Sequence, residues 1–179
     1  GNTNVEASAI PLGGQADSPR VLATGTALSA DGRYVLFNTA VALDPADVNN
    51  RVDGFRFDRV TQTILHVTRD AGGGISSSQG NEASALSAAG DRIVMGPRYT
   101  QLPGINNDTQ HYLRDLTTGT VTLIKQREGW PSSFDRTDAC ELSGNGAVAY
   151  CASRNDYLVD GDNNGFSDVF RNDLAVNGG

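Results

Sequence analysis

The acidic stretch DGDNNGFSD, residues 160–168, has the ligand spacing of a calcium-binding loop. Asp160, Asp162 and Asn164 occupy its first, third and fifth positions, and Asp168 occupies its ninth. Oxygen ligands at alternate positions can converge on one hard cation, and Phe166 at the seventh position can offer its backbone carbonyl. The spacing therefore predicts a Ca²⁺ site with these five residues as ligands.

A tight turn without metal is the alternative interpretation of this stretch. Asp and Asn side chains hydrogen-bond to their own backbone, and Gly adopts the left-handed conformation that turns require. The twelfth position is Arg171, so the bidentate Glu of an EF-hand is missing. A weaker second site is predicted at Asp47, Asn49 and Asp53, where Pro45 stands in place of the first ligand.

The two cysteines, Cys140 and Cys151, flank the ten residues ELSGNGAVAY. If Asn145-Gly146 is a two-residue turn, the cysteines lie directly opposite each other as a hydrogen-bonded pair of an antiparallel hairpin. The Cα–Cα distance between directly opposed residues of antiparallel strands is within reach of a disulfide. We therefore predict a cross-strand disulfide and an oxidising compartment; two free core thiols are the alternative.

Other residues that could do chemistry give weaker signals. His66 and His111 stand in strand-like segments and are interpreted as half-exposed strand residues rather than catalytic bases. Trp130 could stack on a sugar or a peptide, or pack against its own fold. The sequence contains no G-x-S-x-G motif, so no catalytic residue is predicted.

Composition excludes two classes of partner. The net charge is −7 with a pI near 4.6, which disfavours nucleic acid because phosphate binding needs clustered Lys and Arg. Apolar runs such as 34–37 are far too short for a bilayer-spanning helix, so we expect no membrane insertion.

The elements that position these residues come from an internal repeat. The phrase LSADG at 28–32 returns as LSAAG at 86–90 and as LSGNG at 142–146. Each copy continues with an apolar stretch, a loop rich in Gly, Asp and Asn, and an aromatic strand. We predict an N-terminal strand region at 1–26 and three repeats at 27–84, 85–140 and 141–179, the last without its fourth strand.

Four short antiparallel strands per repeat are typical of a β-propeller blade, so the predicted fold class is all-β with about three blades. The combination LSADGRYVLF, an Asp-rich loop and DGFRFD resembles the TolB-type, WD40-like (PD40) repeats of bacterial secreted and periplasmic propellers. The loop at 160–168 also resembles the calcium loops of integrin-type blades.

The resemblance implies a non-catalytic scaffold, outside the cytoplasm, that binds a protein or peptide. The alternatives are a carbohydrate-processing hydrolase or lyase with its site at the propeller mouth, and a propeller lectin. Because propellers have four to eight blades, the chain is expected to be part of a longer propeller or to form a homodimer with six blades.

Overall fold

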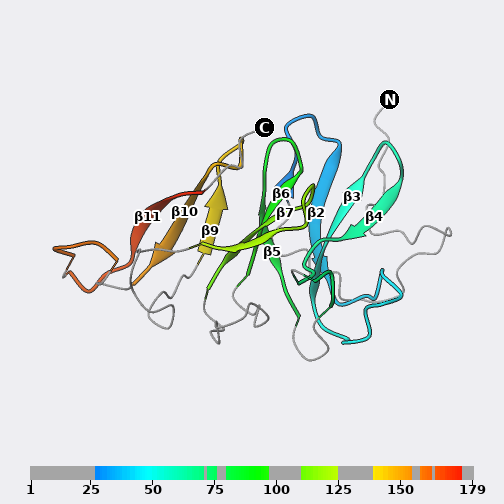
Figure 1. The fold of residues 1–179 in the computed structure, drawn as a ribbon, viewed down its shortest axis with the longest axis horizontal. Coiled ribbons are helices and arrows are strands. Elements are labelled where there is room, and N and C mark those ends of the chain that lie inside the picture. Colours follow the sequence, from blue (N-terminus) through cyan, green and yellow to red (C-terminus); the bar gives the residue numbers. More distant parts are fainter. Residues whose placement is uncertain are drawn as a thin grey trace.

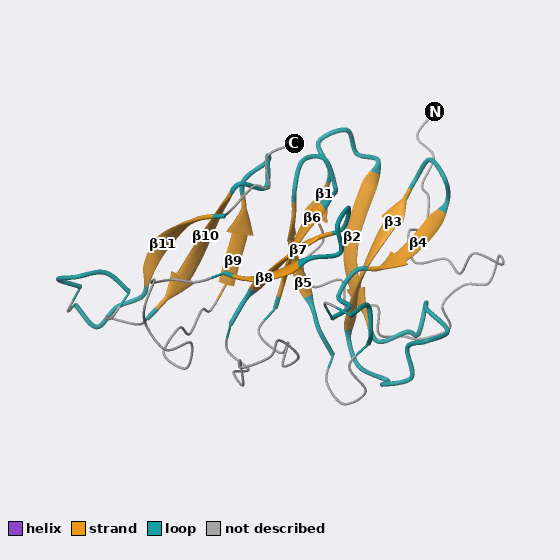
Figure 2. Cartoon of the chain, in the orientation of Figure 1, coloured by secondary structure: helices purple, strands orange, loops and turns teal. Residues whose placement is uncertain are grey.

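The computed structural model describes residues 27–70, 72–75, 80–96, 110–124, 139–154, 158–162 and 164–174. All regular structure in these residues is β, as Figure 2 shows. The strands are β1 (Ala27–Leu28), β2 (Tyr34–Thr39), β3 (Asp53–Asp58), β4 (Thr63–His66), β5 (Ala83–Leu86), β6 (Arg92–Met95), β7 (Tyr112–Asp115), β8 (Val121–Leu123), β9 (Ala139–Leu142), β10 (Val148–Ser153) and β11 (Asp168–Asp173).

Each repeat forms its own antiparallel sheet. The described residues give the orders β1-β2-β3-β4, β5-β6-β7-β8 and β11-β10-β9. The three sheets stand side by side along the molecule in Figure 1, with the order of the repeats preserved. Consecutive strands joined by short connections, repeated as adjacent sheets, make three successive blades of a partial β-propeller. The predicted fold class is confirmed.

The turn between the first two strands is the same in all three repeats. Gly32, Gly90 and Gly146 have φ of 66°, 76° and 68°, the left-handed region that favours glycine. Their N–H groups donate to the carbonyls of Ser29, Ser87 and Ser143 at 2.8–2.9 Å. The repeated Leu-Ser-x-x-Gly phrase therefore specifies one turn conformation.

The serine hydroxyl stabilises this turn. Ser29 Oγ accepts from the N–H of Tyr34 at 2.9 Å and donates to Asp31 at 2.6 Å. In the second repeat Ala89 replaces the aspartate, and Ser87 Oγ donates instead to Asp91 at 2.6 Å. The departure from the repeat pattern is thus compensated two residues later.

Two apolar clusters join the sheets face to face. The first packs residues of the first repeat against the second repeat; its buried members are Leu36, Val67, Ala83, Leu86, Ile93, Met95 and Tyr112. The second packs the second repeat against the third; its buried members are Ala85, Val94, Leu113, Ile124, Cys140, Ala149 and Cys151. Burial of these side chains supplies the main attraction between neighbouring blades.

The connections fall on two opposite edges of the array (Figure 2). The short turns 29–33, 59–62, 87–91 and 143–147 lie at one edge, which we call the turn edge. The loop 40–52 and the described residues of the loop between β10 and β11 (154, 158–162 and 164–167) lie at the other edge, which we call the loop edge. These loops hold predicted calcium ligands.

Candidate functional site

One asparagine organises the loop between β10 and β11. Asn164 Oδ1 accepts a hydrogen bond from the N–H of Phe166 at 2.7 Å, and its Nδ2 donates to Asp168 Oδ2 at 3.0 Å. Gly161 and Gly165 have φ of 89° and 70°. Asp168, the predicted ninth-position ligand, therefore has a partner within the loop itself, as the turn interpretation requires.

The loop of the first repeat has the same arrangement. Asn49 Oδ1 accepts from the N–H of Arg51 at 2.7 Å, and its Nδ2 donates to Asp53 Oδ2 at 2.9 Å. Asp47 Oδ1 accepts from the N–H of Asn49 at 3.3 Å. An Asn and an Asp four residues later are thus a repeated device that closes both loops.

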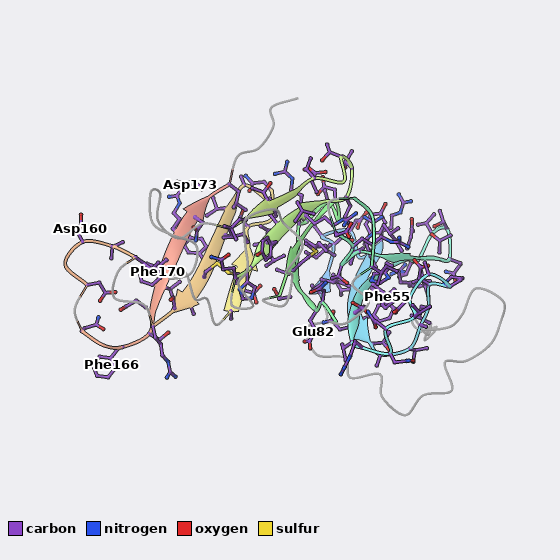
Figure 3. All side chains as sticks on the ribbon, turned by 60° about the horizontal axis from the view of Figure 1, so that its bottom comes forward. Phe55, Glu82, Asp160, Phe166, Phe170 and Asp173 are labelled. Atoms are coloured by element: carbon purple, nitrogen blue, oxygen red, sulfur yellow. A yellow bond between two sulfur atoms is a disulfide. The ribbon has the colours of Figure 1, made fainter. Side chains whose placement is uncertain are left out.

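Hydrogen bonds join some of the predicted metal ligands: Asn164 to Asp168 in the third repeat, and Asn49 to both Asp47 and Asp53 in the first. Asn164 contacts Asp168, whereas Asp160 and Phe166 lie on different sides of the loop in Figure 3. In the described part of the chain, no group of three His, Cys, Asp or Glu side chains is arranged to hold a metal ion. Asp162 Oδ1 is buried and lacks a hydrogen-bond partner, and an unpartnered buried carboxylate oxygen suits a cation. The calcium site stays a prediction.

A buried polar cluster lies at the same edge of the first sheet. Asp53 is 1% exposed, and its Oδ1 accepts from the N–H of Asn81 at 3.0 Å. The N–H of Gly54 donates to the Asn81 carbonyl, also at 3.0 Å. Because Asn81 leads directly into β5, the first strand of the second sheet, the Asp53 carboxylate joins two blades.

His66 lies at the centre of this cluster with its side chain fully buried. Its Nε2 is 3.9 Å from Asp53 Oδ1 and 3.3 Å from Thr68 Oγ1, and its Nδ1 is 3.9 Å from Asp44 Oδ2. Asp44 forms an ion pair with Arg69. Two carboxylates therefore lie near the imidazole, and the positive charges of Arg69 and Arg114 also act on it.

Burial shifts the pKa values of the two central groups in opposite directions. It lowers the pKa of His66 to about 4, with the positive charge of Arg69 adding to the effect. It raises the pKa of Asp53 to about 6, although hydrogen bonds from Asn81 and Asn49 oppose the rise. At pH 7 the histidine is neutral and the aspartate is mainly charged.

The hydroxyl group nearest His66, that of Thr68, is already hydrogen-bonded to the backbone. Thr68 Oγ1 accepts from the N–H of Gly54 at 2.9 Å. The contacts of this cluster tie strands and loops together, which is a structural role.

The prediction that His66 and His111 are half-exposed was wrong, because each is 3% exposed. Strand alternation shows which face a residue occupies, but not that a distant loop covers that face. Asp44, which lies 22 positions before His66, approaches the imidazole in the structure. The sequence would have indicated the burial of His66 only if the loop 40–52 had been predicted to pack over β4.

The predicted disulfide between Cys140 and Cys151 is present, and the two residues are directly opposite in register. The expected two-residue turn was wrong. The N–H of Ser143 bonds to the Val148 carbonyl at 2.8 Å and closes a four-residue loop. This moves the cysteines to a non-hydrogen-bonded position, where opposed strands approach most closely, and their Cα atoms are 4.1 Å apart.

Two solved structures show where this arrangement of blades is found. TolB from Acinetobacter baumannii is similar over 86% of this chain and 30% of its own, with 19% identity and a TM-score of 0.50. A putative TolB from Agrobacterium tumefaciens is similar over 82% of this chain and 41% of its own, with 14% identity and a TM-score of 0.52. The fold is that of a TolB-like β-propeller.

This TolB-like chain spans less than half the length of either structure. No protein-family model matches the sequence, and no curated protein matches it. None of the described residues lies in a helix that could cross a membrane. The predicted N-terminal strand region at 1–26 and Trp130 lie outside the described residues.

Proposed function

We propose that this TolB-like chain is a non-catalytic interaction scaffold that binds a protein or peptide at its loop edge. The proposal rests on the contacts that the buried charged side chains make within the protein. Asp53 joins two blades through Asn81, and Arg114 of the second repeat donates to the carbonyl of Asp70 at 3.0 Å. Groups that could have done chemistry instead hold the loop edge in shape.

The exposed surface of the loop edge suits a polypeptide with apolar side chains. Val48 and Phe166 are each 76% exposed, and Val159 is 51% exposed. Phe166 projects from the loop in Figure 3. Large apolar side chains exposed on loops are typical contact residues of protein interfaces.

Peptide selection tests this proposal directly. Peptides selected from a random library on the wild-type chain should lose at least about tenfold in affinity for Phe166→Asp, since tenfold is about 1.4 kcal/mol and a central aromatic anchor contributes about 2 kcal/mol or more. Val60→Asp is the matched control, because Val60 is 71% exposed but lies at the turn edge. Equal loss in both variants, or no saturable peptide binding, would contradict the proposal.

We further propose that the loop 160–168 binds Ca²⁺ as part of this scaffold. The buried, unpartnered Asp162 Oδ1 supports this step. Calorimetric titration with calcium should give saturable heat for the wild type and for Asp173→Ala, and none for Asp162→Ala. Absence of heat in the wild type, together with thermal stability that calcium does not change, would remove the proposal and leave the turn interpretation.

An extracytoplasmic location is part of the same proposal. The disulfide between Cys140 and Cys151 supports it, because disulfides persist in oxidising compartments such as the periplasm or the exterior of the cell. Thiol labelling of the native chain purified from its source should find neither cysteine reactive. Labelling of both would contradict the location.

A further inference from the structure

The loop between β10 and β11 contains the dipeptide Asn164-Gly165, and both of its residues are exposed. In an Asn-Gly pair the backbone nitrogen of the glycine can attack the side-chain carbon of the asparagine, because glycine has no Cβ to hinder the approach. The N–H of Gly165 bonds to no acceptor in the residues that the structure describes, and a Cβ at Gly165 would meet nothing within 4 Å. The attacking nitrogen is therefore accessible to water and to base.

The hydrogen bonds of Asn164 favour this reaction at both ends of its side-chain amide. Its Oδ1 accepts from the N–H of Phe166 at 2.7 Å, and this donor stabilises the negative charge that the attack places on the oxygen. Its Nδ2 lies 3.0 Å from Asp168 Oδ2, so this carboxylate can relay a proton to the nitrogen as it leaves. The loop thus activates the amide of Asn164.

The first repeat provides a comparison that differs chiefly at the attacking residue. Asn49 accepts from the N–H of Arg51 at 2.7 Å and donates to Asp53 at 2.9 Å, which are the same two bonds. Asn50 follows it in place of a glycine, and the Cβ of Asn50 crowds the backbone nitrogen. We therefore expect Asn49 to be stable although its amide is activated in the same way.

The turn of the third repeat provides the opposite comparison. Asn145-Gly146 is also an Asn-Gly pair, and its asparagine is exposed. Gly146, however, is buried, and its N–H donates to the Ser143 carbonyl at 2.8 Å. A nitrogen whose proton is held in this bond cannot attack until the turn opens. Of the three asparagines compared, Asn164 alone combines an activated amide with an accessible nucleophile.

We propose that Asn164 is a site of spontaneous deamidation. The nitrogen of Gly165 loses its proton to a base in the solvent and bonds to Asn164 Cγ, the Cγ–Nδ2 bond breaks, and Nδ2 takes up a proton and leaves as ammonia. Water then opens the five-membered succinimide at either of its carbonyls, which leaves aspartate or isoaspartate at position 164. Water is the only co-reactant, and no atom is oxidised or reduced.

The modification removes the bond that closes the loop. The amide that donates to Asp168 becomes a carboxylate, so two like charges face each other where a hydrogen bond was. The isoaspartate product also adds a methylene group to the backbone directly before Gly165 and Phe166. Ageing of the protein therefore changes the loop that carries Phe166.

Ageing of the native chain in mildly alkaline buffer tests the proposal. Tandem mass spectrometry of proteolytic peptides should locate the mass gain from replacing an amide NH₂ with OH at Asn164, and not at Asn49 or Asn145. In guanidinium chloride Asn164 and Asn145 should react at similar rates, since both are then unfolded Asn-Gly pairs. In the native chain Asn145 should react at least roughly tenfold more slowly than Asn164. Equal native rates at these two residues, or a native Asn164 that stays unmodified, would overturn the proposal.

Two variants test the part played by the attacking residue. Gly165→Ala places a methyl group beside the nucleophilic nitrogen, in open space, and should slow the modification of Asn164 several-fold without changing that of Asn145. Asn50→Gly is the reverse change, at a residue whose φ of 53° already lies in the region that glycine favours. It should make Asn49 reactive. A chain with Asn50→Gly that leaves Asn49 intact would overturn the proposed basis of the reaction.

These experiments are independent of peptide binding at the loop edge. If Asn164 deamidates but Phe166→Asp binds the selected peptides as tightly as the wild type, the scaffold proposal fails alone. If the peptides bind through Phe166 and Asn164 stays intact on ageing, the deamidation proposal fails alone.

Discussion

At the scale of single residues, Asp53 and His66 contribute opposite pH dependences to one buried cluster. The pKa of His66 falls from its ordinary 6.5 to about 4, so its share of stability is present above pH 6.5 and is lost as the pH falls through 4. The pKa of Asp53 rises from 3.8 to about 6, so its share is present below pH 3.8 and is lost as the pH rises through 6. Between pH 4 and 6 the two shares oppose each other.

Replacing His66 should leave the contribution of Asp53 to the pH dependence of stability unopposed. His66→Phe keeps an aromatic ring against Phe55, whose ring centroid is 4.7 Å away, and removes the proton-binding site. Relative to the wild type, the free energy of unfolding should rise on going from pH 6.5 to pH 4, by up to ~3 kcal/mol. Urea unfolding at a series of pH values measures this difference. A variant that loses stability in parallel with the wild type on acidification would show that His66 titrates normally.

Replacing the aspartate should have the opposite effect. Asp53→Asn keeps an oxygen for the N–H of Asn81 but cannot ionise. Relative to the wild type, its free energy of unfolding should fall as the pH is lowered from 6 to 4, because the gain from protonating Asp53 is absent. The same urea titrations measure it, and Asp173→Asn, at an exposed carboxylate, serves as the control. Identical slopes for Asp53→Asn and Asp173→Asn would contradict the shifted pKa.

At the scale of elements, the Leu-Ser-x-x-Gly turn is sensitive both to backbone conformation and to the neighbouring blade. A Cβ at Gly90 would lie 2.3 Å from the Tyr34 ring, whereas a Cβ at Gly119 meets nothing within 4 Å. The two glycines have nearly equal φ, 76° and 75°. They therefore separate backbone strain from the close approach of the blades.

Alanine at these two glycines should give unequal losses of stability. Gly119→Ala should cost ~1 kcal/mol for a left-handed alanine, and Gly90→Ala should cost roughly 2–4 kcal/mol because overpacking adds to that strain. Chemical unfolding of the two variants measures both values. Equal costs would mean that Tyr34 moves aside without penalty.

The disulfide stabilises the third sheet, which has three strands in the described residues. Closing a loop across the 11-residue separation of Cys140 and Cys151 should contribute roughly 3 kcal/mol by restricting the unfolded chain. Reduction, or the Cys140→Ala/Cys151→Ala variant, should lower the urea midpoint accordingly. If reduction of the wild type leaves the midpoint unchanged, the hairpin is held by packing alone.

Local sequence rules predicted the strands, turns and hairpin register within each repeat. They missed the contacts that residues make with other repeats. The repeated phrase, its glycine and the alternating strands predicted the sheets, and counting across the hairpin placed Cys140 opposite Cys151. The loop length was wrong because the Ser143 bond to Val148 extends the turn. The role of Asp53 could not be predicted, since its partner Asn81 lies 28 positions away in the next blade.

At the scale of the whole molecule, hydrogen exchange should report whether the array continues. The amides of Ala30 and Ala88 are bonded within the chain and should exchange slowly at every protein concentration. The amide of Gly144 has no acceptor among the described residues and should exchange faster than both. Equal exchange rates at all three amides would contradict this order.

The bonds from Ala30 to Ala88 to Gly144 also give the row of blades a polarity. Every peptide in the row points the same way, so one end presents only a donor and the other only an acceptor. Two like ends brought together would oppose donor to donor or acceptor to acceptor, and neither pairing satisfies the backbone. The array can therefore be extended in only one sense, and a ring built from it has a fixed direction of travel around its axis.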